Sequence, residues 1–403
     1  MRILSVTAQK MDSTGSGVFL TELTRGFDKQ GHQQAIVCGV APEDTLNPVP
    51  GVDVFPVRYR TPELPFPVCG MSDEMPYEST RYRDLNDVMT GQLLAAFRDK
   101  LREAVDAFRP DVILCHHLYF LAALAREMYP DLPVYGQCHG SDLRQIKKNP
   151  WQRDWITENV KKLDGIFALH AQQKDTILET FGIPEEKVFT LGTGYNSGVF
   201  YLNEQAKSQR ISGKQRLIFA GKLSEKKGLC SLLRALSRLN HPERYELALA
   251  GGYGNAGEYR VICHLAEYAP CPVTFLGRLN HRELALEMNK SDIFILPSFY
   301  EGLPLVLIEA MACGLRTVCT DLPGIRPWLD RAIPENGTVF VTPPRMYNED
   351  EPYPEDLPAF ETRLARAIET VQQISLPDPA LVSRVSWDSL CRDYCGIWNY
   401  ETT

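Results

Sequence analysis

The chain has 403 residues, of which 44% are hydrophobic and 23% are charged, and its formal net charge is -8. This length predicts two domains or more, and the composition is ordinary for a soluble globular protein. The acidic balance argues against nucleic acid as a partner, because proteins that bind it carry a basic excess.

The 11 cysteines form no CxxC pair, and Cys391 and Cys395 have no histidine at zinc-finger spacing. Free thiols at this density fit a reducing cytoplasm. The N-terminal run MRILSVTAQK predicts a strand instead of a signal peptide, because its apolar part is short. No run reaches the ~18 apolar residues of a membrane span. We therefore expect a cytoplasmic protein without a metal.

Short apolar runs alternate with helical patterns in the first half of the chain. Strands are expected at 2–8, 35–39, 52–57, 111–117, 133–139, 165–169 and 187–191. Helices are expected at 18–30, 85–108, 119–129, 150–162 and 172–181. This alternation predicts βαβ units and a parallel sheet that is covered on both faces.

A polar stretch without periodicity, residues 200–214, is interpreted as a linker, and the alternation restarts after it. Strands are then expected at 216–222, 245–252, 272–277, 292–297, 316–321 and 338–342. Helices are expected at 226–239, 255–269, 280–290, 303–313, 356–374 and 384–400, with an acidic surface loop at 348–358. The sequence thus predicts an α/β protein with two Rossmann-like, doubly wound domains that face a central cleft. Ligands of such sheets bind beyond the carboxyl ends of the strands.

Glycines follow a strand in each half. Gly15 and Gly17 lie between strand 2–8 and the next helix, and Gly251 and Gly252 end strand 245–252. Such glycines let a backbone approach a ligand, and the helix N-terminus behind them favours an anion. The alternative is an ordinary tight turn.

The sequence HGSD directly follows strand 133–139. His139 and Asp142 leave the strand end together, which favours a functional role at the cleft. The alternative is structural, since Ser141 or Asp142 can cap a helix.

Three lysines, Lys222, Lys226 and Lys227, cluster where strand 216–222 turns into a helix. Cations at a helix start oppose the helix dipole, and a bound anion would remove this conflict. The alternative is a solvated lysine run, which fits Lys226 best.

Two carboxylates flank an apolar helix in FYEGLPLVLIEAMACG, residues 299–314. Gly302, Leu303 and Pro304 are expected to start this helix, with Glu301 before it and Glu309 about two turns along. An unpaired buried carboxylate costs several kcal/mol, so Glu309 needs a donor such as the hydroxyls of a ribose. Together with the lysines, the two carboxylates predict a hydroxyl-rich ligand bridged by phosphate, which describes a sugar nucleotide.

These motifs resemble the retaining glycosyltransferases of family 4, which have the GT-B fold, and the resemblance covers nearly the whole chain. It is carried by the N-terminal glycines, HGSD, the GK…KKG element, AGG, FLGRL and the Glu-x7-Glu spacing of Glu301 and Glu309. It implies an acceptor-side domain of residues 1–200 with a crossing helix at about 380–403. The donor domain is then residues 201–379.

The resemblance also implies roles. Glu301 and His139 would contact the donor sugar, Glu309 the ribose, and Lys222 and Lys227 the diphosphate. The implied donor set is Gly15, Gly17, Lys222, Lys227, Gly251, Arg278, Leu279, Glu301, Gly302, Leu303 and Glu309, with the base near Arg278 and Leu279. Lys222 departs from the usual arginine and loses its bidentate fork. His139, Lys227 and Glu301 are the expected catalytic residues.

No acidic metal motif stands out, so lysines and helix N-termini are expected to stabilise the leaving diphosphate without a metal. The expected reaction transfers a hexosyl unit with retention, by front-face substitution, to a hydroxyl of a glycan, lipid-linked or small-molecule acceptor. A UDP-sugar is the first expectation for the donor, by the family's habits. Alternatives are a sugar-nucleotide epimerase of the same fold, a dinucleotide oxidoreductase, which lacks its GxGxxG here, and a non-catalytic nucleotide-sugar binder.

The stretch 64–80 is long for a connection and is interpreted as a wall of the acceptor pocket, against a self-packed surface excursion. The expected acceptor set is Met71, Ser72, Asp73, Met75, Tyr77, His117 and Asp142. A basic segment with two tryptophans, residues 144–155, with lysines at 161–162, makes peripheral membrane contact an alternative to a solvated helix.

Overall fold

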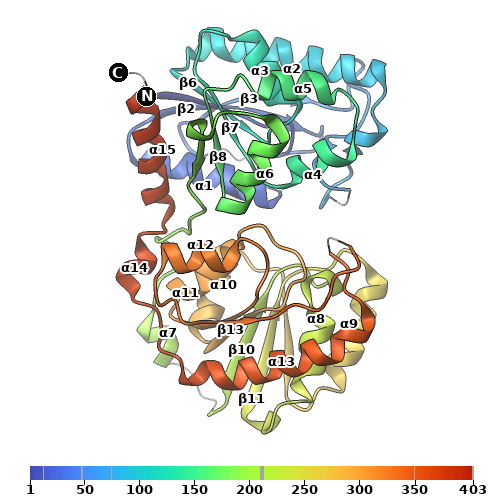
Figure 1. The fold of residues 1–403 in the computed structure, drawn as a ribbon, viewed down its shortest axis with the longest axis vertical. Coiled ribbons are helices and arrows are strands. Elements are labelled where there is room, and N and C mark those ends of the chain that lie inside the picture. The colour runs from blue at the N-terminus through green and yellow to red at the C-terminus, as the bar shows by residue number, and fades with distance from the viewer. Residues whose placement is uncertain (12, 47–48, 74, 209–212, 349, 402–403) are drawn as a thin grey trace. The chain divides into compact units, whose positions relative to one another are not determined.

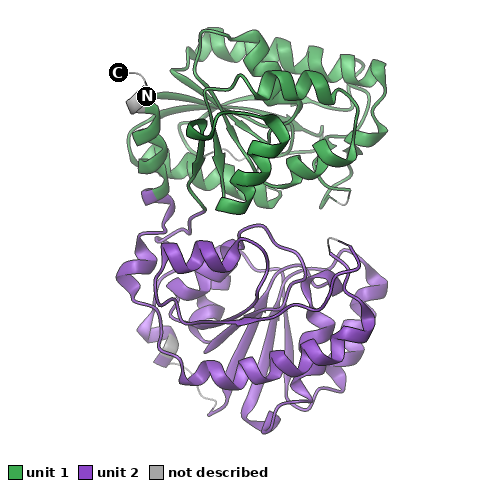
Figure 2. Cartoon of the chain, in the orientation of Figure 1, with its two compact units in different colours: residues 1–192, 390–403 green, residues 193–389 purple. Residues whose placement is uncertain are grey.

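A computed structural model describes residues 1–11, 13–46, 49–73, 75–208, 213–348 and 350–401. The chain divides into two compact units, shown in Figure 2. Unit 1 comprises residues 1–192 and 390–403, and unit 2 comprises residues 193–389. None of the helices in the described residues is long and apolar enough to cross a membrane.

Unit 1 contains one seven-stranded parallel sheet in the order β3-β2-β1-β6-β7-β8-β9 (Figure 1). Its strands are β1 (Arg2–Val6), β2 (Gln33–Val40), β3 (Asp53–Arg58), β6 (Val112–His116), β7 (Val134–Gln137), β8 (Gly165–Ala168) and β9 (Val188–Thr190), with a separate pair β4 (Cys69–Gly70) and β5 (Thr80–Arg81). Its helices are α1 (Gly15–Lys29), α2 (Asp87–Phe108), α3 (Phe120–Met128), α4 (Ser141–Lys148), α5 (Arg153–Val160) and α6 (Ala171–Phe181), with short 3-10 turns at Tyr82–Asp84 and Glu185–Lys187.

Both faces of this sheet are buried, which explains the continuous apolar runs in its strands. Successive side chains of a strand point to opposite faces. Leu4 and Val37 belong to one hydrophobic cluster with residues of α2 and α3, whereas Ile36 and Cys38 belong to another with Leu20 of α1.

Unit 2 contains a six-stranded parallel sheet in the order β12-β11-β10-β13-β14-β15. Its strands are β10 (Gln215–Ala220), β11 (Tyr245–Ala250), β12 (Val273–Gly277), β13 (Ile293–Leu296), β14 (Arg316–Thr320) and β15 (Thr338–Val341). Its helices are α7 (Glu204–Ser208), α8 (Leu229–Leu236), α9 (Ala256–Glu267), α10 (His281–Asn289), α11 (Leu305–Ala312), α12 (Ile325–Ala332), α13 (Leu357–Thr370) and α14 (Pro379–Ser383), with 3-10 turns at Glu225–Lys227, Pro242–Arg244, Pro354–Asp356 and Val371–Gln373.

The last helix, α15 (Trp387–Glu401), enters unit 1 at Leu390. Tyr394 hydrogen-bonds the Gln137 side chain, and its ring centroid lies 4.2 Å from that of Phe167. The Sγ atom of Cys391 donates to the carbonyl of Leu23 at 3.5 Å. The end of the chain therefore completes the core of unit 1.

Both sheets and the GT-B, two-Rossmann architecture were predicted, whereas some helices were not. The predicted linker, residues 200–214, contains α7, and its residues 209–212 lie outside the described residues. The Asn203 N–H, just before α7, donates to Asn289 at 2.7 Å, so the start of this segment packs on the rest of unit 2. Helices α4 and α12 were missed. The helix predicted at 303–313 begins at Leu305, because Pro304 stands at its N-cap in an extended conformation.

One glycine fixes the path of the chain after β10. Gly228 has φ +68°, and a Cβ there would lie 1.9 Å from the carbonyl oxygen of Pro297. We expect Gly228→Ala to lower the free energy of unfolding of unit 2 by about 3 kcal/mol, since it adds a left-handed penalty and a backbone clash. Urea unfolding would measure the loss. Gly91→Ala, at an open position of α2, is the matched control and should be neutral or stabilising. Equal effects of the two substitutions would contradict this account.

Candidate functional site

The strand order reverses direction around β10 in unit 2. Strand β10 pairs with β11 on one side and with β13 on the other, so the chain connections leave it in opposite directions. Such a switch point opens a crevice beyond the carboxyl ends of the strands. The loops that follow β10, β11 and β13 carry most of the predicted donor residues.

The turn after β10 is tied to the loop after β13. The Phe299 N–H donates to the carbonyl of Lys226 at 3.0 Å, and Gly228 lies directly against Pro297. This close approach, which only a glycine permits, brings two segments about 70 residues apart into contact.

The tie places Lys227 beside Glu301. Lys227 Nζ donates to Glu301 Oε1 at 2.7 Å, and Ser298 Oγ donates to the same oxygen at 2.7 Å. Ser298 is fully buried, whereas the side chains of Lys227 and Glu301 are 30% and 14% exposed. A ligand can therefore reach both charged groups, and Ser298 fixes the carboxylate. Ser298 was not predicted; its position between strand β13 and Glu301 was the available signal.

Glu309 lies on α11 and is 9% exposed. Its negative charge contributes, after burial, to a raised pKa of about 12 for the thiol of Cys313, one turn later. Before the helix, Gly302 is exposed and Leu303 is buried. Gly302 is thus accessible, and Leu303 contributes packing.

The glycine turn after β11 packs against two cationic side chains, Arg278 and Lys222. A Cβ at Gly252 would lie 2.3 Å from Arg278 Nε, and one at Gly254 would lie 2.8 Å from Lys222 Cε. Gly251 adopts φ +146°, and its N–H donates to the carbonyl of Gly277 at 2.7 Å. A Cβ at Gly251 would lie 1.8 Å from the carbonyl oxygen of Gly221, so this position requires glycine, whereas the side chains of Arg278 and Lys222 occupy the space above Gly252 and Gly254.

A pocket of about 450 Å³ adjoins this turn. It is lined by Leu223, Gly251, Gly252, Tyr253, Tyr259, Phe275, Gly277 and Arg278. The rings of Tyr253 and Tyr259 are stacked, with centroids 4.0 Å apart, and Tyr253 is 48% exposed. Sequence reasoning missed both tyrosines. Leu279, half-buried, follows Arg278 in the connection to α10.

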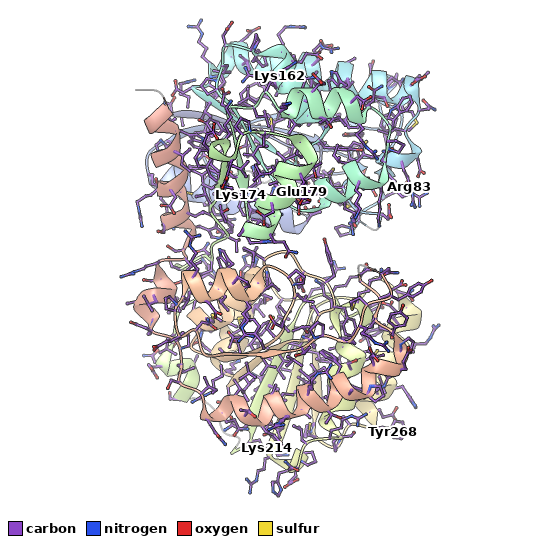
Figure 3. The ribbon with its side chains drawn as sticks, viewed as in Figure 1. Arg83, Lys162, Lys174, Glu179, Lys214 and Tyr268 are labelled. Atoms are coloured by element: carbon purple, nitrogen blue, oxygen red, sulfur yellow. The ribbon has the colours of Figure 1, made fainter. Side chains whose placement is uncertain are left out.

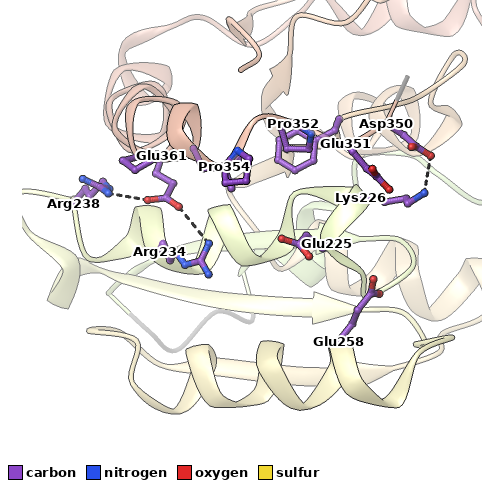
Figure 4. Close-up of a pocket in the computed structure, with 13 residues that line it drawn as sticks. Glu225, Lys226, Arg234, Arg238, Glu258, Asp350, Glu351, Pro352, Pro354 and Glu361 are labelled. Carbon is purple, nitrogen blue, oxygen red and sulfur yellow. Dashed lines mark hydrogen bonds and ion pairs between the residues drawn. The ribbon is translucent and has the colours of Figure 1, made fainter. Parts of the chain in front are cut away.

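A second hollow in unit 2, of about 760 Å³, lies between α8 and the segment 350–358 (Figure 4). Ion pairs lie across it: Glu361 accepts from Arg238 Nη2 at 2.8 Å, and Lys226 Nζ donates to Asp350 at 2.8 Å. Lys226, interpreted from the sequence as solvated, is 52% exposed and also links this acidic segment to the turn that carries Lys227.

In unit 1 three histidines gather after β6 and β7. His116 Nδ1 lies 3.1 Å from His139 Nε2, and the ring centroids of His117 and His139 are 4.7 Å apart. Burial lowers the pKa of His116 to about 3, assisted by His117. Burial also lowers the pKa of His117, against the opposing charge of Asp142, and the pKa of His139, assisted by both other histidines. All three rings are therefore neutral at pH 7. The described residues hold no group of three or more His, Cys, Asp or Glu suited to a metal ion.

Asp142 is fully buried between these loops. Its Oδ2 accepts from the backbone N–H of Leu118 at 2.8 Å and of His139 at 3.3 Å, and Cys138 Sγ donates to Oδ1 at 3.4 Å. This carboxylate was placed in the predicted acceptor set. Its burial favours a positioning role, in which it holds the turns that carry His117 and His139.

The predicted N-terminal glycines lie inside α1. Thr14 caps the helix, and its Oγ1 accepts from the Gly17 N–H at 3.0 Å. Gly15 is exposed, with no atom within 4 Å of a Cβ there. Gly15 is thus the accessible one of the two, although no tight loop requires it.

The described residues of the stretch 64–80 pack largely on one another and on the rest of unit 1. Met71 is 3% exposed, and its carbonyl accepts from Gln145 Nε2 at 3.1 Å. Met75 covers Gly70, and Tyr77 packs on the core beneath Lys10. Ser72 is partly exposed.

Asp73 is exposed, 3.6 Å from Arg83, which is labelled in Figure 3. An acceptor can therefore meet Ser72 and Asp73 but not the side chain of Met71.

The basic segment with two tryptophans is anchored in unit 1. Trp151 Nε1 donates to Thr90 Oγ1 at 3.0 Å, Trp155 Nε1 donates to Glu127 at 2.6 Å, and both rings pack against the hydrophobic core. Lys162, labelled in Figure 3, is exposed. The two tryptophans are thus used for packing.

Two family models match the chain in succession. Residues 13–198 match the model described as Glycosyltransferase Family 4, and residues 202–349 match the model described as Glycosyl transferases group 1. An uncharacterized glycosyltransferase of Methanocaldococcus jannaschii is 25% identical over 255 residues, which is 52% of this chain and 65% of that protein. The chain spans only 54 to 65% of the length of the first curated relatives it matches.

Solved structures resemble the chain along its whole length. A sucrose-phosphate synthase from Thermosynechococcus elongatus has a TM-score of 0.67 at 16% identity, covering 100% of this chain and 99% of its own. Anabaena HepE, solved with UDP-glucose, has a TM-score of 0.67 at 13% identity, and the match covers 99% of this chain and 100% of HepE. The fold is therefore GT-B, and the family models together with it support a glycosyltransferase of the family 4 type.

The buried histidines make unit 1 sensitive to acid. Because their pKa values are lowered in the folded protein, the unfolded chain binds more protons as the pH falls below about 6.5. For His116 the stabilisation is complete above that pH and is lost as the pH falls toward its lowered pKa of about 3, at about 1.4 kcal/mol per pH unit, and the lowered pKa values of His117 and His139 act in the same direction. We expect β6 and β7 to lose hydrogen-exchange protection between pH 7 and pH 5.

The variant His116→Gln should reduce that pH dependence, and His264→Gln, at an exposed position, should not. Exchange is compared after correction for its intrinsic pH dependence. A protection free energy that stays flat across this range in the unmodified protein would contradict neutral burial.

Proposed function

We propose that the chain is a retaining glycosyltransferase that moves a hexosyl unit from a nucleotide-diphosphate sugar to an acceptor hydroxyl. The acceptor is sugar-containing, as a glycan, a lipid-linked sugar or a small molecule. The observation that carries the proposal is the contact between Lys227 and Glu301 at the switch point of unit 2. It places a cation that can bind phosphate beside a carboxylate that can bind sugar hydroxyls, close enough for one sugar nucleotide to contact both.

The paired state of Lys227 and Glu301 suits a ligand with two chemistries. A diphosphate would bind the ammonium group of Lys227, and sugar hydroxyls would donate to the carboxylate of Glu301. Each charged group would therefore exchange one polar partner for another when the donor binds. Ser298 keeps Glu301 in place during this exchange. A ligand with only phosphate would leave Glu301 without a cation, which favours a sugar nucleotide over a free nucleotide.

The reaction follows from where charge develops. Cleavage of the bond between the anomeric carbon and the diphosphate oxygen places negative charge on the diphosphate. Lys227, Lys222 and the Gly302 amide would stabilise that charge, which is electrostatic preorganisation. The acceptor oxygen attacks from the same face, and its proton passes to the departing diphosphate. Configuration is retained, and no covalent enzyme intermediate or metal is required.

A UDP-sugar is the proposed donor. The likeness to HepE, solved with UDP-glucose, supports this choice. The pocket beside Arg278 and Tyr253 is proposed to receive the base, since its aromatic and backbone lining offers stacking and hydrogen bonds. His139 of unit 1 is proposed to contact a sugar hydroxyl, and Glu309 the ribose.

Two other functions use the same donor site. An epimerase would convert the sugar nucleotide without an acceptor, and a non-catalytic binder would release it unchanged. Transfer to an acceptor, with UDP as the second product, distinguishes the transferase from both.

The base and the metal dependence can be tested together. We expect a thermal-shift panel of UDP, GDP, ADP and CDP and their sugar nucleotides, in EDTA, to show the largest shift with a UDP-sugar. Ligand at a hundred times its Kd adds about 2.7 kcal/mol to the stability of the folded state. A panel without any shift in EDTA that recovers with magnesium would refute metal independence. No shift in either condition would refute the donor site.

The neighbouring lysines offer a matched pair of variants. Lys227→Met should lower kcat/KM for transfer about a hundredfold or more, because it removes a charge aimed at the leaving diphosphate. The ammonium group of Lys226 faces Asp350 instead, so Lys226→Met should retain most activity. Steady-state release of UDP in the presence of acceptor would measure both. Equal losses in the two variants would show that Lys227 has no special role.

A further inference from the structure

The contact between His116 and His139 leaves one question of chemistry open. Two neutral imidazoles share a hydrogen bond between His116 Nδ1 and His139 Nε2, at 3.1 Å. One of these two nitrogens donates its proton and the other accepts it. Because a neutral ring has one N–H group, the second nitrogen of the donating ring carries no proton. His139 Nε2 is engaged in either case, so the direction of this bond decides whether the other nitrogen of His139, Nδ1, carries a proton.

The far nitrogen of His116 indicates the direction. His116 is 2% exposed, and its Nε2 atom is buried without a hydrogen-bond partner among the described residues. If His139 donated, His116 would carry its own proton on Nε2 as a buried, orphaned N–H. If His116 donates from Nδ1, Nε2 is only an unused acceptor. Orphaned buried N–H groups are the rarer of the two in folded proteins.

The surroundings of His139 leave its Nδ1 edge for a ligand. Its ring packs edge-on against Phe19 at an interplanar angle of 86°, and its Nε2 is taken by His116. The carboxylate of Asp142 is engaged with backbone N–H groups rather than with the ring. His139 is partly exposed, and its Nδ1 atom is not among the buried side-chain atoms without a partner, which include His116 Nε2.

We propose that His116 is a positioning residue that holds His139 as its Nδ1–H tautomer, so that His139 offers a neutral N–H donor to an oxygen of the bound ligand. In this form His139 has no free basic nitrogen, because Nε2 already accepts from His116. It therefore recognises a hydroxyl or ether oxygen and does not act as a general base. The identity of the ligand as a sugar rests on the proposed function, but the tautomer does not.

Nitrogen NMR of the full chain, labelled with 15N at the histidine rings, tests the tautomer without a ligand. His139 is assigned by the loss of its signals in His139→Gln. We expect a protonated Nδ1 and an unprotonated Nε2 for His139 near pH 7. A protonated Nε2 would overturn the proposal, whatever the activity of the protein.

Two variants of residue 116 separate the hydrogen bond from packing. His116→Leu removes the donor, and a substantial part of His139 should shift to the Nε2–H form. His116→Asn keeps an amide N–H near the former Nδ1 position and should restore the Nδ1–H form. If His139 has the same tautomer in both variants, residue 116 does not control it. If the leucine variant does not fold, the spectrum of the unmodified protein and that of the asparagine variant decide.

The consequence for catalysis is measured separately. If the proposed transfer occurs, His116→Leu should lower kcat/KM about tenfold, and His116→Asn should recover most of that loss. Absence of transfer with every donor and acceptor tested would refute the proposed function while the tautomer result stands. Transfer that is unaffected by His116→Leu, in a protein whose His139 has changed tautomer, would refute the donor role of His139.

Discussion

The candidate donor site depends on one steric constraint, the contact between the turn at Gly228 and the carbonyl of Pro297. The sheet topology brings the ends of β10 and β13 side by side, but parallel pairing alone leaves the loops beyond them undetermined. The absence of a side chain at residue 228 lets the two loops touch, and the backbone hydrogen bond from Phe299 then fixes their register. Lys227 and Glu301 meet as a consequence.

Charge is treated differently in the two units. In unit 2 the opposite charges of Lys227 and Glu301 stay partly exposed, so neither bears the full cost of desolvation before a ligand arrives. In unit 1 burial keeps His116 and His139 neutral. In the proposed transfer, an ammonium group would stabilise the charge that develops on the leaving diphosphate, whereas recognition of hydroxyls needs only oriented dipoles.

The strands were predictable because helices cover both faces of each sheet, and strands buried in this way have continuous apolar sequences. The positions of the motifs after strand ends followed from the same pattern. The pairing of Lys227 with Glu301 was not predictable, since it depends on a contact between residues 74 positions apart. Helix α7 was missed because its polar sequence carries little periodicity, and its stability comes from packing on unit 2.

Burial also separates the residues that a ligand can touch from those that shape the site. Asp142 and Met71 have the chemistry and the chain position of contact residues. However, the Asp142 carboxylate accepts from backbone N–H groups, and the Met71 side chain packs in the core. Near them, His139 and Ser72 stay partly exposed and Asp73 is exposed. The side chains that a ligand can touch in unit 1 are therefore different from the side chains that hold its loops in place.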